Sequence, residues 1–261
     1  MPSKGFGCMD IWMVGVLFAG GTLAGAISAT AGGSSFITFP LLLSTGLPPF
    51  AAAITNYIAL IPSNAVALLG YREELARVRH KLPTPLTIAA VGGFIGSMLL
   101  LWSGAAVFAR MVPWLFFAAT ALFALGTWIK ARLRHRAPLA GRGWKGVSLF
   151  LQFLLALYGG FFGAAMGFVL LACLNIFDYD DLHEANTVKN AFISVFSLIG
   201  AAIFLTSGQM SWLHGLPIAI GTLFGGYGAV RYIRTLPEPI LRYGILLWAA
   251  VLTSYYFLQS P

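Results

Sequence analysis

The stretch GVSLFLQFLLALYGGFFGAAMGFVLLACLNIF, residues 146–177, contains no Asp, Glu, Lys or Arg. A helix needs about 20 apolar residues to cross the hydrocarbon core of a bilayer. This stretch is too long for one simple crossing and too short for two. The glycines of its centre, YGGFFGAAMG, weaken a helix there. Because unwound backbone at membrane depth is tolerated only in buried or cavity-lining positions, we expect a broken helical element packed inside a membrane protein.

The rest of the chain has the same character. Of its 261 residues, 59% are hydrophobic and 9% are charged, whereas soluble domains carry about 25% charged residues. Five further runs lack charged side chains: 11–71, 82–109, 111–129, 190–230 and 243–261. We therefore predict an all-α, multi-pass protein of the plasma membrane, of the bacterial inner-membrane type. Cys8 and Cys173 form no ligand cluster, so we expect no metal, no cofactor and no disulfide.

An internal repeat is visible when the sequence is compared with itself at an offset of 132 residues. The informative identities are between Pro, Thr, Gly and Arg positions: Thr55 with Thr187, Pro85 with Pro217, Gly93 with Gly225, Gly96 with Gly228 and Arg110 with Arg242. Repeats of this kind are typical of transporters. We predict a tail (1–10), a first half (11–130), a basic linker (131–143) and a second half (144–261).

Each half is expected to open with a glycine-broken element, 11–45 or 146–177, followed by three helices. In the first half these helices are 50–71, 84–103 and 107–130, and Pro62 is expected to kink the first of them. In the second half they are 181–206, 212–233 and 238–258.

Loop charge bears on the orientation of the halves. The segments 72–81 and 130–145 are strongly basic and so are expected in the cytoplasm. The segment 231–242, with three arginines, joins them there only if the broken elements re-enter the membrane from the side they left. We therefore favour two inverted halves over two parallel ones. The net charge of +8 is assigned to orientation and lipid headgroups, because no soluble basic module for nucleic acid is present.

Several motifs resemble one family of membrane proteins. ANTVKN (185–190), TSGQMSW (206–212) and GTLFGGYGA (221–229) are similar to the second half of TauE/SafE sulfite exporters. AGAISATAGGSSFITFPLL and AAAITNYIALIPSNAVA in the first half resemble that family's opening element and second helix. The resemblance covers nearly the whole chain. It implies transport of sulfite, sulfonates or related organosulfur and carboxylate anions. The first half has no charge where the second has Lys189, so the charge partner of an anion comes from one half only.

Lys189 is the first candidate for the substrate site. It is placed deep in helix 181–206, where a cation costs at least about 2.5–3.5 kcal/mol on insertion scales. One reading is that its side chain extends to the nearer membrane surface and pairs there with Glu184 or with an Asp of the preceding loop. The other is that it neutralises a bound anion. Asn186 and Asn190 lie three residues before it and one after it on the same helical face, and would complete an oxyanion pocket.

The second candidate is the break GGSS in the first half. Gly32, Gly33, Ser34 and Ser35 would expose backbone N–H groups at the start of a half-helix, with Thr38 one turn further on. Such a terminus carries about half a positive charge and binds anions. The alternative is close helix packing through small residues, which needs no ligand.

The third candidate is Thr55 with Asn56, together with the repeat partner Thr187. A hydroxyl inside a helix usually bonds its own i−4 carbonyl, so the threonines are less informative than the buried asparagine.

Three functional classes remain open on the sequence alone. The leading one is a secondary transporter of small anions, bound between the halves. An assembly or biogenesis subunit is the alternative. An intramembrane hydrolase with Ser34 or Ser35 as nucleophile lacks a histidine at membrane depth to act as base, so we expect neither catalytic residues nor an enzyme. Neither the anion nor its coupling ion nor the oligomeric state follows from these residues.

Overall fold

The computed structural model of the chain describes residues 10–30, 33–70, 72–133, 142–164, 166–179 and 181–232, with positions 247, 251 and 254. These residues are overwhelmingly helical and include no strand, which confirms the all-α class. Gly32, the expected helix 238–258 and most of the basic segment 231–242 lie outside the described residues.

The first half begins with two helices separated at the GGSS sequence. They are α1 (Ile11–Thr30) and α2 (Ser35–Ser44), and Gly33 between them has φ of 90°. A positive φ suits glycine because it has no Cβ. The following elements are α3 (Pro49–Ala59), α4 (Ile61–Gly70), α5 (Arg72–Val78), a 3-10 turn (Arg79–Lys81) and α6 (Pro83–Leu133).

The second half follows with α7 (Arg142–Phe161), α8 (Met166–Phe177), α9 (Leu182–Thr206) and α10 (Trp212–Tyr232). Gly163, between α7 and α8, has φ of 76°. α9 begins at an N-cap, Asp181, whose side chain accepts a hydrogen bond of 2.8 Å from the backbone N–H of His183. An N-cap of this kind stabilises a helix by about 1 kcal/mol.

Two interruptions expected from the sequence are confirmed. α6 turns back on itself at Gly104, whose φ of 69° and ψ of 167° separate the two helices predicted at 84–103 and 107–130. The kink expected near Pro62 lies between α3 and α4. There the carbonyl of Ala59 accepts a hydrogen bond of 3.0 Å from Thr222 of α10, which satisfies a backbone acceptor at the break.

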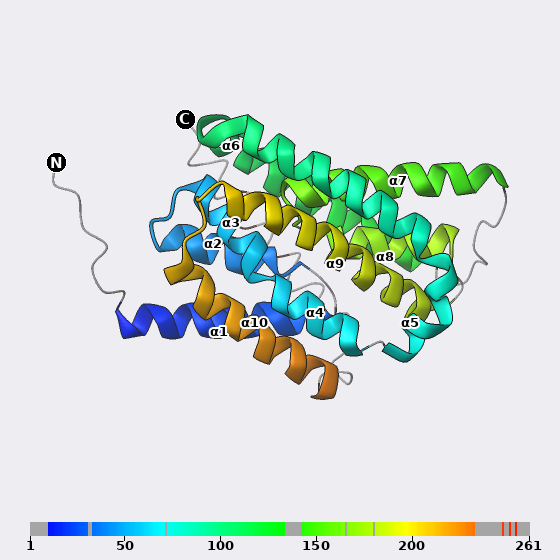
Figure 1. Cartoon of the computed structure of the whole chain (residues 1–261), viewed down its shortest axis with the longest axis horizontal. Coiled ribbons are helices and arrows are strands. Elements are labelled where there is room, and N and C mark those ends of the chain that lie inside the picture. The colour runs from blue at the N-terminus through cyan, green and yellow to red at the C-terminus, as the bar shows by residue number, and fades with distance from the viewer. Residues whose placement is uncertain are drawn as a thin grey trace.

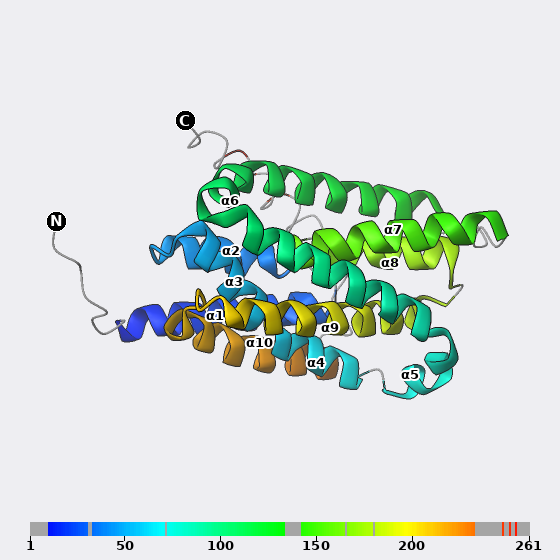
Figure 2. The same ribbon diagram turned by 45° about the horizontal axis from the view of Figure 1, so that its top comes forward.

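The helices lie roughly parallel to the long axis of the molecule (Figures 1 and 2). α1, α4 and α10 form one side, α6, α7 and α8 form the other, and α9 lies between them with α2 and α3. α1 and α2 form a hairpin that enters from the left in Figure 1 and returns to the left, whereas α7 and α8 enter from the right and return to the right. The connections of both hairpins therefore lie in the middle of the molecule.

Glycines allow the outer helices to pack closely. α1 packs along α10, and a Cβ atom at Gly225 would overlap the backbone oxygen of Thr22. α6 packs along α7, and a Cβ atom at Gly96 would overlap the backbone oxygen of Leu157. Small residues at such positions let the backbones of membrane helices approach closely.

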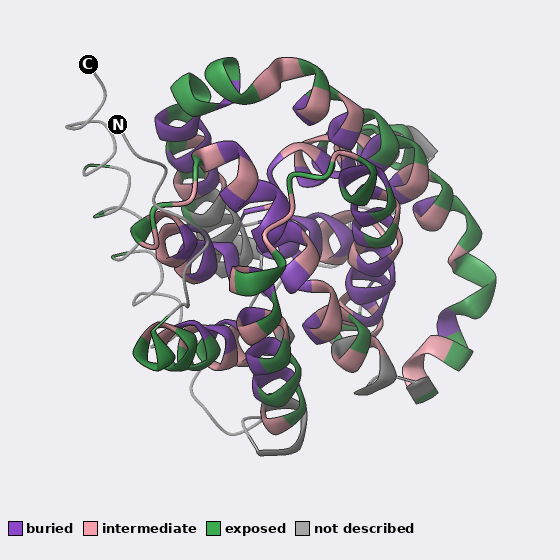
Figure 3. Cartoon of the chain, turned by 60° about the vertical axis from the view of Figure 1, so that its left-hand side comes forward, coloured by how far each residue is buried: buried purple, intermediate pink, exposed green. Residues whose placement is uncertain are grey.

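The surface and the helix lengths are those of a multi-pass membrane protein. Within the described residues, four helices contain apolar stretches long enough to cross a bilayer: Ile11–Ser28, Pro83–Leu122, Trp144–Phe161 and His183–Thr206. Large apolar side chains lie exposed on the outer helices, including Trp102 (86% exposed) and Phe224 (60%), while buried residues gather towards the centre (Figure 3). An apolar exterior of this extent suits lipid rather than water.

The basic segments gather at one end of the bundle. α5, the end of α6 and the start of α7 all lie at the right of Figure 1, and α10 runs towards that same end. The connections before α3 and before α10 lie at the opposite end. This is the end that the excess of Lys and Arg predicts to lie in the cytoplasm.

Candidate functional site

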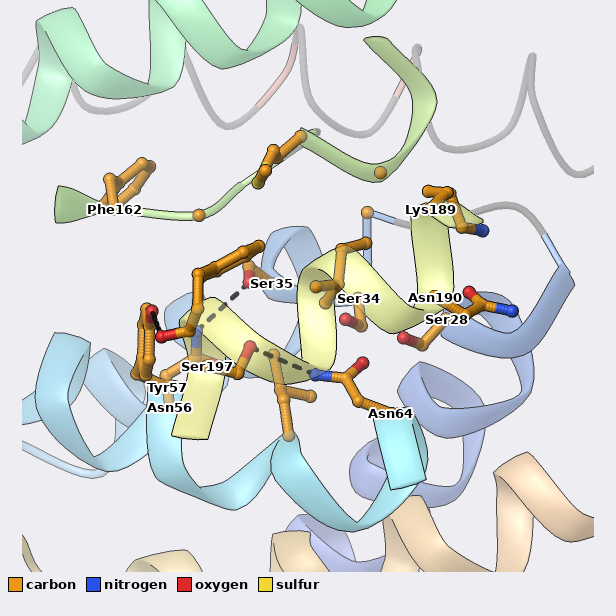
Figure 4. A pocket seen from close by; sticks show the side chains of 17 residues that line it. Ser28, Ser34, Ser35, Asn56, Tyr57, Asn64, Phe162, Lys189, Asn190 and Ser197 are labelled. Carbon is orange, nitrogen blue, oxygen red and sulfur yellow. Dashed lines mark hydrogen bonds between the residues drawn. The ribbon is translucent and has the colours of Figure 1, made fainter. Parts of the chain in front are cut away.

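A cavity of about 60 Å³ lies where the two hairpin connections meet. Its wall is formed by Ser28, Gly33, Ser34, Ser35, Asn56, Tyr57, Leu60, Asn64, Phe162, Gly163, Met166, Gly167, Lys189, Asn190, Ile193, Phe196 and Ser197. Figure 4 shows Phe162 of the α7–α8 connection on one side of the polar side chains and Asn56 and Tyr57 of α3 on the other. Since a cavity needs at least about 10–15 Å³ by this measure to hold one water, it has room for a few waters or one small oxyanion.

Among the described residues of this wall, Lys189 is the one that carries a charge, and it is only 1% exposed. It lies about 10 Å beyond the first residue of α9, at a rise of 1.5 Å per residue. Its neighbour Asn190 is 5% exposed, and the Nδ2 atom of Asn190 has no hydrogen-bond partner. A buried donor without an acceptor costs about 1–3 kcal/mol, which a ligand oxygen would recover.

The N-terminal ends of α2 and α8 both reach the cavity. Ser34 and Ser35 come from the start of α2, and Met166 and Gly167 from the start of α8. At α2 the amides of Phe36, Ile37 and Thr38 donate to the carbonyls of Gly33 and Ser34. A helix N-terminus still carries partial positive charge, so both termini place such charge near Lys189.

Asn56 connects α3 to α2 beneath the cavity. Its Nδ2 donates to Ser35 Oγ over 3.2 Å, and its Oδ1 accepts a short hydrogen bond from Thr38 Oγ1. Thr38 also donates to the carbonyl of Ser34 at 3.1 Å. The Ser35 hydroxyl therefore accepts from Asn56 and, within the described part of the chain, donates to no other residue. Its proton is available to a ligand.

The sequence candidates thus divide into two groups. Gly33, Ser34, Ser35, Asn56, Lys189 and Asn190 line the cavity, and Thr38 supports it from behind. Thr55, Asn186 and Thr187 do not line it. Thr55 accepts a hydrogen bond of 3.0 Å from the amide of Ser211 at the start of α10, and Thr187 donates to its own i−4 carbonyl at His183. The Oδ1 atom of Asn186 is buried without a hydrogen-bond partner, one helical turn before Lys189.

Four polar residues of the wall were not among the candidates from the sequence: Ser28, Tyr57, Asn64 and Ser197. Helical spacing identifies one of them. Ser197 follows Lys189 by eight residues, about two turns further along α9, whereas Asn64 is separated from Asn56 by the break between α3 and α4. Asn64 Nδ2 donates to Ser197 Oγ at 3.4 Å and joins α4 to α9 (Figure 4). In the second half, Gly163 and Gly167 also line the cavity.

Comparisons with known proteins agree on one family. The model of the family described as sulfite exporter TauE/SafE matches residues 17–256. A protein of Haemophilus influenzae named "Probable membrane transporter protein" is 26% identical over 254 residues, covering 94% of this chain and 96% of the relative. "Probable membrane transporter protein YfcA" of Escherichia coli K12 is 25% identical over 249 residues, covering 93% and 88%. No solved structure matches the chain.

Proposed function

The chain belongs to the sulfite exporter TauE/SafE family, and we propose that this membrane transporter is a secondary carrier of small anions in the plasma membrane. The leading substrates are sulfite, sulfonates and related organosulfur or carboxylate anions. The observation that carries the proposal is a lysine, 1% exposed, in the wall of a small central cavity.

The energetics of Lys189 favour an anionic ligand. A cation inside a membrane protein is expensive to bury, and such residues usually mark a substrate or ion pathway. The Nδ2 atom of Asn190, a residue of the same wall, is buried without a hydrogen-bond partner, and the N-termini of α2 and α8 add partial positive charge. Among the described residues of the wall there is no carboxylate and no histidine. A wall that carries a cation and no carboxylate suits an oxyanion better than a metal ion or an amine.

We further propose that the cavity lies on a pseudo-two-fold axis between inverted halves. The 132-residue offset pairs four sets of wall residues with one another: Ser34 with Met166, Ser35 with Gly167, Tyr57 with Lys189 and Asn64 with Phe196. The helices related by the offset, α1 with α7 and α10 with the first leg of α6, run in opposite directions in Figure 1. α1 of the first half packs on α10 of the second, and in the same way α7 of the second half packs on α6 of the first. Such an exchange of helices would let the two halves rotate as rigid bodies about one central site.

Proteoliposomes test the carrier directly. Purified protein is reconstituted, loaded with sulfite, and efflux is compared for wild type and Lys189→Met. Saturable efflux that the variant loses supports the proposal. Absence of flux for sulfite, sulfonates and small carboxylates from correctly folded wild type would favour an assembly role instead. Chemical conversion of the solute during the assay would indicate a hydrolase.

A further inference from the structure

A second cavity, of about 580 Å³, lies at the cytoplasmic end of the bundle. Ligand sites in proteins usually measure about 300–1,000 Å³. The wall is formed by His80, Lys81, Thr84, Pro85, Lys145, Leu149, Gln152, Phe177, Asp178 and Tyr179. These residues come from the 3-10 turn before α6, from α6, from α7 and from the end of α8. None of them belongs to the wall of the central cavity.

This cavity lies at the level of the membrane surface. Trp144, the residue before Lys145, is 46% exposed and stacks on Phe177, with ring centroids 6.0 Å apart and an interplanar angle of 26°. Tryptophan is enriched where lipid headgroups meet the hydrocarbon core. Trp144 also begins one of the four apolar stretches. The cavity therefore opens at the level of the headgroups of the inner leaflet.

One wall of the cavity presents hydrogen-bond acceptors. Asp178 Oδ2 accepts a short hydrogen bond from Ser148 Oγ and another of 3.1 Å from Gln152 Nε2. Within the described part of the chain, no basic residue forms an ion pair with Asp178. Gln152 is 1% exposed, and its Oε1 atom has no hydrogen-bond partner. A buried amide oxygen beside a half-buried carboxylate is a site for an N–H donor that carries positive charge.

The cavity also carries cations. Lys145 is exposed at the start of α7, one helical turn before Ser148 and close enough to Asp178 for its charge to act on that carboxyl group. Lys81 closes the 3-10 turn. Lys81 is held in place by Glu184 of α9 at 3.6 Å and by the ring of Tyr179, whose centroid lies 5.1 Å from Nζ. Pockets with basic side chains on the cytoplasmic side of membrane proteins recognise phosphate in lipid headgroups.

We propose that this cavity binds a phosphoethanolamine group, with its primary ammonium on Asp178 and Gln152 Oε1 and its phosphate on Lys145 and Lys81. The headgroup of phosphatidylethanolamine is the expected source, because the cavity opens at headgroup depth beside an exposed tryptophan. The acceptors Asp178 and Gln152 Oε1 determine which lipid headgroup is preferred. Phosphatidylcholine has no N–H to donate, and phosphatidylglycerol has no cation. The proposal does not depend on which solute is transported.

Lipid titration of the full-length protein in detergent tests this site. Affinity is measured by native mass spectrometry for dihexanoyl phosphatidylethanolamine, phosphatidylcholine and phosphatidylglycerol, and for soluble phosphoethanolamine. We expect phosphatidylethanolamine to bind at least about tenfold more tightly than the other two lipids, since one tenfold step corresponds to a single charge-assisted hydrogen bond. Saturable competition by soluble phosphoethanolamine supports the recognition chemistry and shows that acyl chains are dispensable. If the lipid competes and soluble phosphoethanolamine does not, the result supports the lipid as the source of the headgroup.

Variants test the hydrogen-bond acceptors and the cations of the cavity separately. Asp178→Asn keeps an acceptor but removes the charge, and Gln152→Leu removes the amide oxygen, so both should erase the preference for phosphatidylethanolamine over phosphatidylcholine. Lys145→Met should weaken both lipids by a similar factor because both carry phosphate. Glu73→Gln, on exposed α5 at the same end of the protein, is the control and should change neither. Equal affinity of wild type for the three lipids, or an unchanged preference in Asp178→Asn, would overturn the proposal. If Asp178→Asn does not fold, the wild-type comparison and Lys145→Met still decide it.

Discussion

Asn56 Nδ2 donates a hydrogen bond to Ser35 Oγ over 3.2 Å, and this bond fixes the first turn of α2 against the middle of α3. Both residues are buried, at 4% and 7% exposure. Because the Asn56 Oδ1 atom is also occupied by Thr38, the amide orientation is determined on both sides. The serine hydroxyl is consequently held with its proton directed away from Asn56, which is the orientation that a bound anion requires.

Asn56→Asp should abolish anion binding with little change in shape. The carboxylate has no N–H to donate to Ser35, and it places a negative charge in the wall of the cavity that we assign to the anion. We expect affinity for sulfite to fall by at least about a hundredfold, since like charges in such sites cost several kcal/mol. Calorimetry on purified protein measures this. Thr55→Val is the control, because Thr55 contacts Ser211 and does not line the cavity. Wild-type affinity in Asn56→Asp would show that the N-terminus of α2 does not contribute to the anion site.

Lys189→Met should retain the fold and lose most of the affinity. The substitution keeps a side chain of similar length in α9 while removing the buried charge. A hydrogen bond to a charged group contributes about 1.5–3 kcal/mol, so we expect a loss of about tenfold to a hundredfold in affinity. Lys189→Arg should be impaired too, because a planar guanidinium does not fit a cavity of about 60 Å³ shaped for a point charge. Calorimetric binding by Lys189→Met equal to wild type would show that the lysine has a structural role only.

Much of this architecture could be predicted from the sequence, because membranes constrain helices by simple rules. Absence of charge located the helices, the boundary predicted between 84–103 and 107–130 falls at Gly104, and Pro62 located the kink between α3 and α4. Lys189, Asn190 and Asn56 were identified because polar side chains are costly at that depth. The contribution of Gly163 and Gly167 could not be predicted, since a glycine that lines a cavity and one that packs against a helix look alike in sequence.

Whether Thr55, Asn186 and Thr187 line the cavity could not be predicted from the sequence either. Helical periodicity gives the face on which a residue lies but not how far along that face the cavity extends. Asn186 lies on the face of Lys189 yet outside the wall, and Thr187 bonds its own helix. Thr55 Oγ1 accepts a hydrogen bond from the backbone amide of Ser211, which lies just before α10 and 156 residues later in the chain. Such a tertiary partner has no local signal.

Arg77 and Gln209 should label from opposite sides of the membrane. They are separated by the repeat offset of 132 residues, and both are exposed. Arg77 belongs to α5 and Gln209 to the connection between α9 and α10, and these two elements lie at opposite ends of the bundle in Figure 1. In a background without Cys8 and Cys173, an impermeant maleimide added to intact cells should modify Gln209→Cys. It should modify Arg77→Cys only after permeabilisation. Labelling of both from one side would rule out inverted halves.

Gly225→Ala should destabilise the protein, whereas Gly228→Ala should not. The added Cβ at position 225 meets the backbone oxygen of Thr22 on α1, which cannot move aside as a flexible side chain can. Overpacking of this kind typically costs about 1–3 kcal/mol. At Gly228 nothing lies within 4 Å of the added atom. There, alanine gains up to about 1 kcal/mol in helix propensity. Thermal unfolding in detergent measures both variants, and equal midpoints would contradict the close packing of α1 on α10.

Binding of phosphatidylethanolamine should weaken as the pH falls. Burial raises the pKa of Asp178 above its ordinary value of 3.8, and the hydrogen bonds from Ser148 and Gln152 and the charge of Lys145 oppose this only in part. The carboxylate that holds the ammonium is therefore lost at a higher pH than an ordinary aspartate would be.

Other titratable groups also lie near Asp178. Tyr179, with a pKa raised to about 12 by burial, stays neutral across this titration. Lys81, Lys145 and His80 line the cavity, and Glu184 pairs with Lys81. The measurement uses His80→Gln so that the imidazole makes no contribution. Affinities measured as the pH is lowered from about 8 towards the ordinary aspartate pKa of 3.8 should decline for His80→Gln and stay low and flat for the double variant that also carries Asp178→Asn. A declining curve that survives Asp178→Asn would assign the titration to another group and remove Asp178 from the ammonium site.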